Sequence, residues 1–447
     1  MHESNPPNWR LQTIEQHTPR ILEVHVASAC VEWLPQQVLD EVMPLTEVFL
    51  GAGHTLYLVG GIVRDLQLGV PIEALDFDLT TDARPDRVKE LVGPLASAVW
   101  AQGERFGTIG CRIGDRPMEI TTHRAETYTD SSRKPEVQFG DDIELDLSRR
   151  DFTLNAMAVR LATERSNVEL IDPFDGVAAL EARILRTPIE PEVSFNDDPL
   201  RILRAARFIT RYSLSVEDEV FEAAKSLSER MSIVSVERIR DELDKLLDAA
   251  EPSSGLAFLG EVGAWPFVAE FIPVSALEQI GIELDRSRVS NDLRRAILFS
   301  HCSPEDRRSQ LSALRYSNSE TRELRLLLGG FDVIGADGQA VEPTTVRRLV
   351  DRVGYESIPL LLELVDVRAV KDRGVPELFT FMDAEEDLSN LTPHLDGEAI
   401  MDLLGIESGP EIGAALGVLQ ERRLEEGPTD RAGEVEYLLE KYRRRLG

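Results

Sequence analysis

The stretch LVGGIVRDLQLGVPIEALDFDLTT, residues 58–81, decides how the N-terminal part of the chain folds. An apolar run that begins at Leu56 is typical of a buried strand, and it stops at the pair Gly60 and Gly61. The segment IVRDLQLG has the pattern of a short helix, which Gly69 ends. The alternating segment ALDFDLTT then predicts a second strand. This order of elements predicts a small head that mixes helices with a sheet.

Two aspartates, Asp76 and Asp78, flank Phe77 on the second predicted strand. Residues i and i+2 of a strand project from the same face, roughly 6–7 Å apart at Cα. That spacing suits two Mg²⁺ ions about 3.5–4 Å apart, which clamp the attacking and leaving oxygens of a phosphoryl transfer. Aspartate is disfavoured inside strands, so two on one face call for an explanation. The alternative is a surface strand end with solvated acids, because an isolated Asp-x-Asp pattern is weak evidence.

The glycine pair Gly60 and Gly61 lies between the first strand and a helix that begins near Ile62. Glycines at such a turn let the backbone approach a phosphate, and a helix N-terminus presents free N–H groups. Arg64 adds positive charge on the first turn of this helix. The alternative is a turn needed only for chain reversal. Taken together with the aspartates, the turn predicts a triphosphate cradle beside a metal site.

These motifs closely resemble the signature of the tRNA nucleotidyltransferase/poly(A) polymerase family, in particular its class II tRNA nucleotidyltransferases (CCA-adding enzymes). Four further blocks resemble the family's ribose, hinge, nucleotide-selecting and structural helix motifs in the same order. They are SRRDFTLNAMA (148–158), DPFDGVAALEARILR (172–186), DDPLRILRAARF (197–208) and SVERIRDELDKLL (235–247). The resemblance implies an α+β fold, in which a polymerase-β-like palm head precedes an all-helical neck, body and tail. It also implies template-independent addition of CCA to the 3′ end of tRNA from CTP and ATP.

The resemblance assigns roles to the residues of the head. Asp76 and Asp78 are expected to bind two Mg²⁺ ions and to be catalytic, while Gly60, Gly61 and Arg64 are expected to bind the nucleotide. Glu119 is positioned to join the metal cluster, although an ordinary salt bridge to Arg124 is the alternative.

The ribose motif contributes Arg149, Arg150 and Asp151, which the resemblance expects to read the ribose 2′-hydroxyl and to touch phosphate. An ion pair that pins the palm to the next helix is the alternative explanation of this cluster. Asn155 either belongs to the same pocket or only caps or hydrogen-bonds within its own helix.

The nucleotide-selecting motif is expected to choose the base through Asp198 and Arg201, which lie three residues apart on one helical face. Asp198 is also the expected N-cap of a helix that starts at Pro199, and capping alone would explain it. Asp197 stands where the family usually has glutamate, so its shorter side chain puts the efficiency of base selection in question. Arg204 is expected to bind the nucleotide, and Arg207 and Arg240 are expected to contact RNA.

Composition bounds these expectations. The chain has 447 residues, enough for about three or four modules. Lys and Arg total 49 against 80 Asp and Glu, a net charge of −31, which argues mildly against nucleic-acid binding unless basic surface is local. Three scattered cysteines, no secretion signal and no apolar run of membrane-spanning length predict a reducing, cytoplasmic location.

The pattern predicts an N-terminal segment and palm over 1–160, a neck over 161–250, a body over 251–385 and a tRNA-binding tail over 386–447. Residues 1–20 are expected to be loosely ordered, and 124–142 to form a loop. Helical patterns are expected from Asp151 onward, beginning with TLNAMAVRL and DGVAALEARIL.

Several alternatives for the second half and for the activity remain open. The stretch from Leu293 matches the place of a metal-dependent phosphohydrolase segment in family relatives, but His301 is followed by Cys302, so we expect a helical scaffold without hydrolase metals. The block GEAIMDLLG resembles the tail of CCA-adding enzymes. A-addition alone and poly(A) polymerase activity are the enzymatic alternatives, whereas the length of 124–142 disfavours CC-only addition. An inactive RNA-binding relative and a glycosyltransferase are the alternatives from other classes.

Overall fold

The computed structural model describes residues 31, 33–124, 139–335 and 341–446. The N-terminal segment and most of the expected loop over 124–142 lie outside these ranges. Contacts divide the described chain into two compact units. The first comprises the residues up to Glu242 together with Ser254–Phe267, and the second comprises Leu243–Ser253 and the residues from Val268 onward. The division into four segments stays a prediction.

The head is built on a seven-stranded sheet with the order β3-β4-β5-β2-β1-β6-β7. Strands β2 and β5 are parallel, and the other neighbouring pairs are antiparallel. The strands are β1 Leu56–Val59, β2 Phe77–Thr81, β3 Ala98–Trp100, β4 Thr108–Ile113, β5 Arg116–Thr122, β6 Ala158–Arg160 and β7 Glu169–Ile171.

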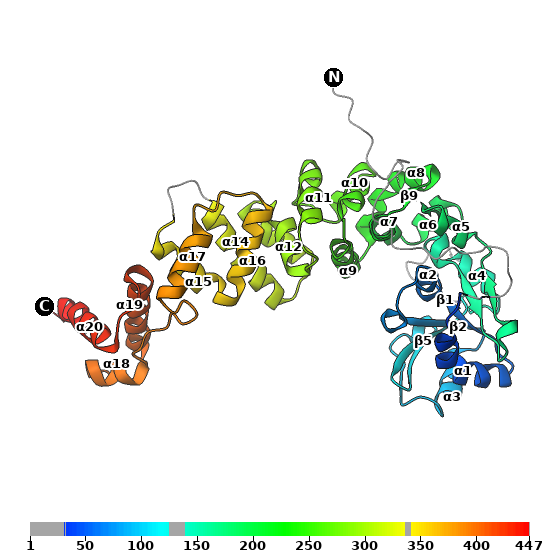
Figure 1. The fold of residues 1–447 in the computed structure, drawn as a ribbon, viewed down its shortest axis with the longest axis horizontal. Helices are drawn as coiled ribbons and strands as arrows, with labels where there is room; N and C mark the ends of the chain where they lie inside the picture. Colours follow the sequence, from blue (N-terminus) through cyan, green and yellow to red (C-terminus); the bar gives the residue numbers. More distant parts are fainter. Residues whose placement is uncertain (1–30, 32, 125–138, 336–340, 447) are drawn as a thin grey trace, which may run out of the picture. The chain divides into compact units, whose positions relative to one another are not determined.

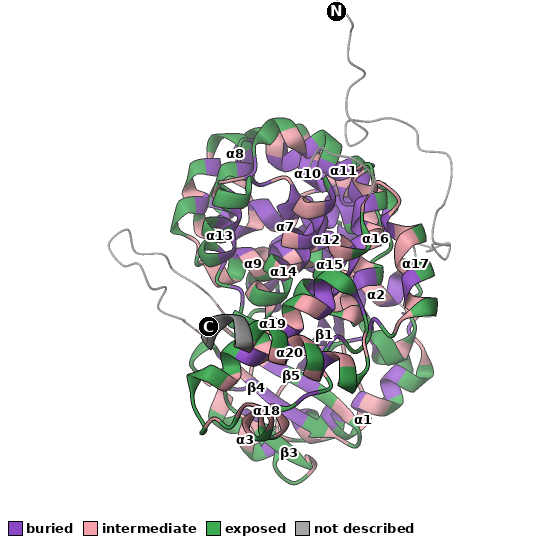
Figure 2. Ribbon diagram, turned by 90° about the vertical axis from the view of Figure 1, so that its left-hand side faces the viewer, coloured by how far each residue is buried: buried purple, intermediate pink, exposed green. Residues whose placement is uncertain are grey.

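One face of this sheet forms the core of the head. Leu58, Leu79, Ile109 and Ile120 point to it and pack with the apolar sides of α1 (Gln36–Gly51) and α3 (Pro85–Val92). Figure 2 shows buried residues along β1, β4 and β5, whereas the outer surface of α3 is exposed. Because side chains alternate along a strand, the residues between these apolar positions project from the opposite face. That opposite face carries Asp78.

The helices of the head and neck follow the expected order. They are α2 Gly61–Gln67, α4 Ile143–Ser148, α5 Gly176–Glu181, α6 Pro191–Asp197, α7 Leu200–Tyr212, α8 Asp218–Ser226, α9 Val236–Leu247 and α10 Ser253–Glu261. The remaining helices are α11 Leu277–Arg286, α12 Asn291–Ser300, α13 Pro304–Ala313, α14 Asn318–Gly335, α15 Pro343–Val353, α16 Ile358–Val367, α17 Val375–Glu385, α18 Gly397–Leu404, α19 Pro410–Glu426 and α20 Arg431–Leu446. Gly405, at φ 63°, ends α18, and Gly409-Pro410 starts α19.

The expectation of a helix over TLNAMAVRL is wrong. Thr153–Asn155 forms a 3₁₀ turn, and the next residues form strand β6, which pairs with β1 through Leu58↔Val159. The apolar run fits a buried strand as well as a buried helix, and the free edge of β1 decides between them.

Two other helical segments are shorter than expected, because strand pairing interrupts them. Helix α5 stops at Glu181, Arg183 takes a left-handed φ of 53°, and Ile184–Leu185 forms strand β8. Strand β8 pairs in parallel with β9, Ser215–Val216, in the part of the chain where helical patterns were expected. These two strands interrupt otherwise helical sequence.

Candidate active site

The open face of the head sheet carries the predicted metal-binding carboxylates. Asp76 directly precedes β2, Asp78 lies on it, and Glu119 lies opposite Asp78 on the parallel strand β5. Burial raises the pKa of Asp78 to about 6; Arg150 opposes this shift, whereas the negative charges of Glu119 and Asp76 add to it. The three carboxylates therefore repel one another around a partly buried position.

These carboxylates fit a divalent cation. Mg²⁺ prefers oxygen ligands, and a cation would relieve the repulsion at Asp78. Among the residues that the structure describes, no three His, Cys, Asp or Glu side chains already converge as a metal cage. An ion would therefore have to draw the side chains of Asp76, Asp78 and Glu119 together.

The turn between β1 and α2 places an arginine over a glycine. Gly60 has φ 75° and ψ −125°, and an added Cβ would lie 2.7 Å from Nη1 of Arg150. Nη2 of Arg150 donates to Oδ2 of Asp146 at 3.2 Å, whereas its buried Nε has no partner among the described residues. The N–H of Gly60 donates to the carbonyl of Met157 at 3.0 Å, so this N–H is not available to a phosphate. The cationic side of the turn therefore comes from Arg150.

Arg64 faces the interior of the first unit. Its guanidinium donates to Oδ1 of Asn155 and to Asp65 at 2.8 Å, and it lies 4.7 Å from the ring centre of Tyr212. Asn155 in turn donates to Oδ1 of Asp151 at 2.9 Å. Arg64 and Asn155 thus belong to one buried network with the ribose motif, and Asn155 lies in a 3₁₀ turn rather than in the helix expected there.

Asp151 joins the palm to helix α7. Its Oδ2 accepts hydrogen bonds from Arg204 at 2.6 and 2.9 Å, and Arg204 also reaches Glu242 on α9 at 3.1 Å. Burial raises the pKa of Asp151, but the charge of Arg204 and the hydrogen bonds from Asn155 and Arg204 outweigh it and bring the pKa to about 2. The structure therefore contains the ion pair considered from the sequence. Recognition of the ribose by Asp151 stays a prediction.

The nucleotide-selecting pair is not joined by side-chain contact in this conformation. Asp198 accepts from the N–H of Leu200 at 3.2 Å and from Arg238 at 2.6 Å. Arg201 donates to Oγ of Ser194 at 2.6 Å and to the carbonyl of Arg149 at 2.5 Å. Helix α7 begins at Leu200, one residue later than expected, so its N-cap is Pro199 and the prediction of Asp198 as the N-cap is wrong. Asp198 lies one residue before the cap and still accepts from the first N–H of the helix.

The two arginines expected to bind RNA both contact acidic residues. Arg207 is buried, lies 2.7 Å from Oε2 of Glu242 and covers the ring of Phe208. Burial and the neighbouring charge of Arg204 lower the pKa of Arg207. This placement fits a structural role better than RNA contact. Arg240 donates to the adjacent Asp241 at 2.9 Å.

Family models match two parts of the chain. The poly A polymerase head domain matches residues 56–186, and the "probable RNA and SrmB-binding site of polymerase A" matches residues 213–273. A CCA-adding enzyme of Lactococcus lactis subsp. cremoris is 31% identical over 88% of this chain and 93% of its own length. One from Streptococcus gordonii is 32% identical over 87% of this chain and 94% of its own. The chain belongs to the family of CCA-adding enzymes.

Solved structures of CCA-adding enzymes share the fold. The Bacillus stearothermophilus enzyme in complex with CTP matches with a TM-score of 0.73 at 24% identity, over 92% of this chain and 98% of that one. The Thermotoga maritima enzyme complexed with tRNA matches with a TM-score of 0.62 at 22% identity, over 92% and 97%. The expected fold, a polymerase-β-like head followed by helices, is confirmed.

The sequence analysis missed two acidic residues that hold arginines of the candidate site in place. Asp146 is fully buried and accepts hydrogen bonds from Arg149 and Arg150 at 3.2 Å. Glu242 accepts a hydrogen bond from Arg204. Burial raises the pKa of Asp146, but the charges of these two arginines outweigh it, and the net pKa is lowered. The spacing of Asp146 to Arg150, i to i+4 on a helical pattern, was the available signal.

Proposed function

We propose that the chain adds CCA to the 3′ end of tRNA, using CTP and ATP and releasing pyrophosphate. The observation that carries the proposal is the register of Asp78 beside Glu119, one strand away from the Gly60–Arg150 turn. This places acidic groups for a metal next to a cation for a triphosphate, as nucleotidyl transfer requires. Membership of the CCA-adding family supports tRNA as the acceptor.

In this proposal Asp76, Asp78 and Glu119 hold Mg²⁺. Bound there, the ions would neutralise the triphosphate and lower the pKa of the RNA 3′-hydroxyl. Arg150 supplies the positive charge for a phosphate beside Gly60, and Asp146 holds its guanidinium in place.

The neck side of the site selects the nucleotide. Asp198 and Arg201 leave their present partners to face the incoming base. Asp151, held by Asn155 and Arg204, lies at the ribose. The oxygens of Asp151 already accept several hydrogen bonds, so contact with the 2′-hydroxyl needs a rearrangement of this network.

No helix in the described ranges is long and apolar enough to cross a bilayer. The described cysteines, Cys111 and Cys302, are buried free thiols. A cytoplasmic location, where thiols stay reduced, is part of the proposal.

Incubation of the protein with tRNA that lacks CCA, together with CTP and ATP, and sequencing of the products test the proposal. We expect addition of C, C and A in that order. Addition of A to a second substrate, tRNA ending in CC, without any addition to tRNA that lacks CCA would indicate an A-adding enzyme, and long A tracts would indicate a poly(A) polymerase. Absence of any incorporation would refute the proposal and favour an RNA-binding role.

Removal of either metal carboxylate tests the site itself. Asp76→Ala and Asp78→Ala should each reduce incorporation by several orders of magnitude, because metal and electrostatic terms are typically worth several kcal/mol of barrier. Folding and tRNA binding should stay near those of the unmodified protein. Asp86→Asn is the matched control, because Asp86 is exposed on α3, which covers the opposite face of the sheet. Robust incorporation by Asp78→Ala would rule out the assignment.

A further inference from the structure

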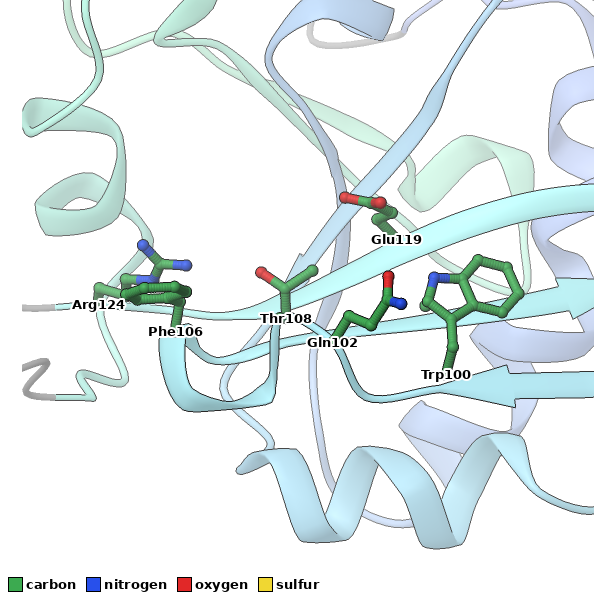
Figure 3. A pocket seen from close by; sticks show the side chains of 8 residues that line it. Trp100, Gln102, Phe106, Thr108, Glu119 and Arg124 are labelled. Atoms are coloured by element: carbon green, nitrogen blue, oxygen red, sulfur yellow. The ribbon is translucent and has the colours of Figure 1, made fainter. Parts of the chain in front are cut away.

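A pocket of about 340 Å³ opens beside the metal carboxylates and shares Glu119 with the proposed metal site. Its walls come from β3, β4, β5 and the connection between β3 and β4, and Glu119 is one of its lining residues. Figure 3 shows Trp100 and Phe106 at opposite ends of this pocket, with Gln102 and Thr108 between them. The pocket thus combines two aromatic side chains with polar groups.

The strand register connects this pocket to the metal site. Trp100 is paired with Gly110, Gly110 with Glu119, and Glu119 with Asp78, so these four residues form one row across the open face. Gly110 leaves the space that the indole of Trp100 occupies, since an added Cβ would lie 1.8 Å from its Nε1. Strands lie about 4.8 Å apart, so β4 crosses the row roughly 10 Å from β2.

The order of the strands places this pocket and the triphosphate cradle on opposite sides of the carboxylates. Gly60 follows β1, on one side of β2, whereas β5, β4 and β3 follow on the other. In an in-line displacement the attacking and leaving oxygens lie on opposite sides of the phosphorus. With the leaving pyrophosphate at Gly60, the attacking 3′-hydroxyl must approach from the side of the pocket.

We infer that the pocket lined by Trp100 and Phe106 binds the terminal base of the RNA 3′ end by stacking. This inference rests on the proposed function and assigns a binding site to the RNA 3′ end that accepts the nucleotide. The charged lining residues are one carboxylate, Glu119, and one guanidinium, Arg124, so charge alone does not select the occupant; the aromatic rings offer their faces to a base. The terminal base changes as nucleotides are added, and stacking accepts different bases because every base has a π-face. The amide of Gln102 can donate to or accept from a base edge.

The first test compares Trp100→Ala with Trp100→Phe in steady-state addition of CMP. Trp100→Ala should raise KM for the RNA by about tenfold and leave KM for CTP unchanged, because one stacked base is lost. Trp100→Phe keeps an aromatic face and should stay near the unmodified protein. Val99→Ala is the matched control, since Val99 is exposed on the same strand but pairs with Cys111 on the other face.

The second test measures binding of an RNA whose 3′-terminal nucleotide lacks its base. This RNA should bind the unmodified protein about tenfold more weakly than the intact RNA, and the difference between the two RNAs should be markedly smaller for Trp100→Ala. The inference would be overturned if the effects of Trp100→Ala and of the missing base on RNA binding were simply additive. It would also be overturned if Trp100→Ala and Val99→Ala had the same KM for the RNA. A rise in KM for CTP alone would assign the pocket to the incoming nucleotide and would also overturn it. Failure of the unmodified protein to add any nucleotide would instead sink the proposed function.

Discussion

Asp198 illustrates how one residue can satisfy two explanations. Its Oδ1 accepts from the N–H of Leu200, the first residue of helix α7, and its Oδ2 accepts from Arg238. Base selection would use the same carboxylate to accept from the exocyclic amine of cytosine or adenine, while Arg201 donates to the ring nitrogen. Uracil and guanine present a carbonyl and an N–H at those places, and leaving such groups unpaired costs about 1–3 kcal/mol each.

Asp198→Asn and Arg201→Ala should therefore raise incorporation of UTP and GTP relative to CTP and ATP, by about tenfold or more. Asparagine retains the oxygen that accepts from the N–H of Leu200, so helix α7 should stay intact in the first variant. Arg238→Ala removes the other partner of Asp198 and serves as the control for loss of that ion pair. Single-nucleotide incorporation with each of the four nucleotides measures the selectivity. Unchanged selectivity in both variants would leave the contact with the N–H of Leu200 as the explanation of Asp198.

At the scale of elements, one buried network joins the palm to the helices that follow it. Asp151 precedes the 3₁₀ turn, Arg204 lies on α7, and Glu242 lies on α9. The three elements are far apart in sequence, so the network holds the neck against the palm within the first unit. Such a buried carboxylate stabilises the fold only while it is ionised.

Asp151→Asn should lower the stability of the first unit in a pH-dependent way. The pKa of Asp151 falls from 3.8 to about 2 on folding, which corresponds to about 2 kcal/mol. Because the folded pKa is the lower one, this stabilisation is full above about pH 4 and is lost as the pH falls towards 2. Thermal unfolding midpoints of the two proteins should therefore converge between pH 5 and pH 2. Asp241→Asn, which removes an exposed carboxylate, should show no such convergence.

At the scale of the whole molecule, the second unit has a buried cluster where a phosphohydrolase site was considered. His301 lies 2.7 Å from Oε2 of Glu283, and Arg368 lies 2.7 Å from its Oε1. Burial raises the pKa of Glu283, but hydrogen bonds from His301 and Gln279 and the charge of Arg368 outweigh it, and the net pKa is lowered. His301 is thus engaged in an internal contact between α11, α12 and α16.

We expect no metal-dependent phosphatase or phosphodiesterase activity from this unit. Release of phosphate or hydrolysis of 2′,3′-cyclic nucleotides, measured with added Ni²⁺ or Mn²⁺, should stay at background. Hydrolysis that persists in Asp76→Ala would contradict this expectation, because it would require a second site. Glu283→Gln should instead lower the unfolding midpoint of the second unit, since it leaves Arg368 and His301 with a weaker partner.

Local patterns determined the parts of the head whose signals lie close together in sequence. The strand at Leu56, the helix near Ile62 and the strand that carries Asp78 all followed from alternation and glycine positions. The five family motifs, read in order, indicated the fold. The sequence placed Asp76 and Asp78 on one strand, but strand β2 begins at Phe77, so only Asp78 lies on it and Asp76 directly precedes it.

Only the tertiary structure decided which distant residues share the site. The parallel pairing of β2 with β5 brought Glu119 beside Asp78, and the edge of β1 turned the segment after Asn155 into a strand. The partners of Arg150 and Arg204 likewise came from other elements. Strand register and buried ion pairs depend on contacts between segments far apart in the chain, and residue spacing carries no direct record of those contacts.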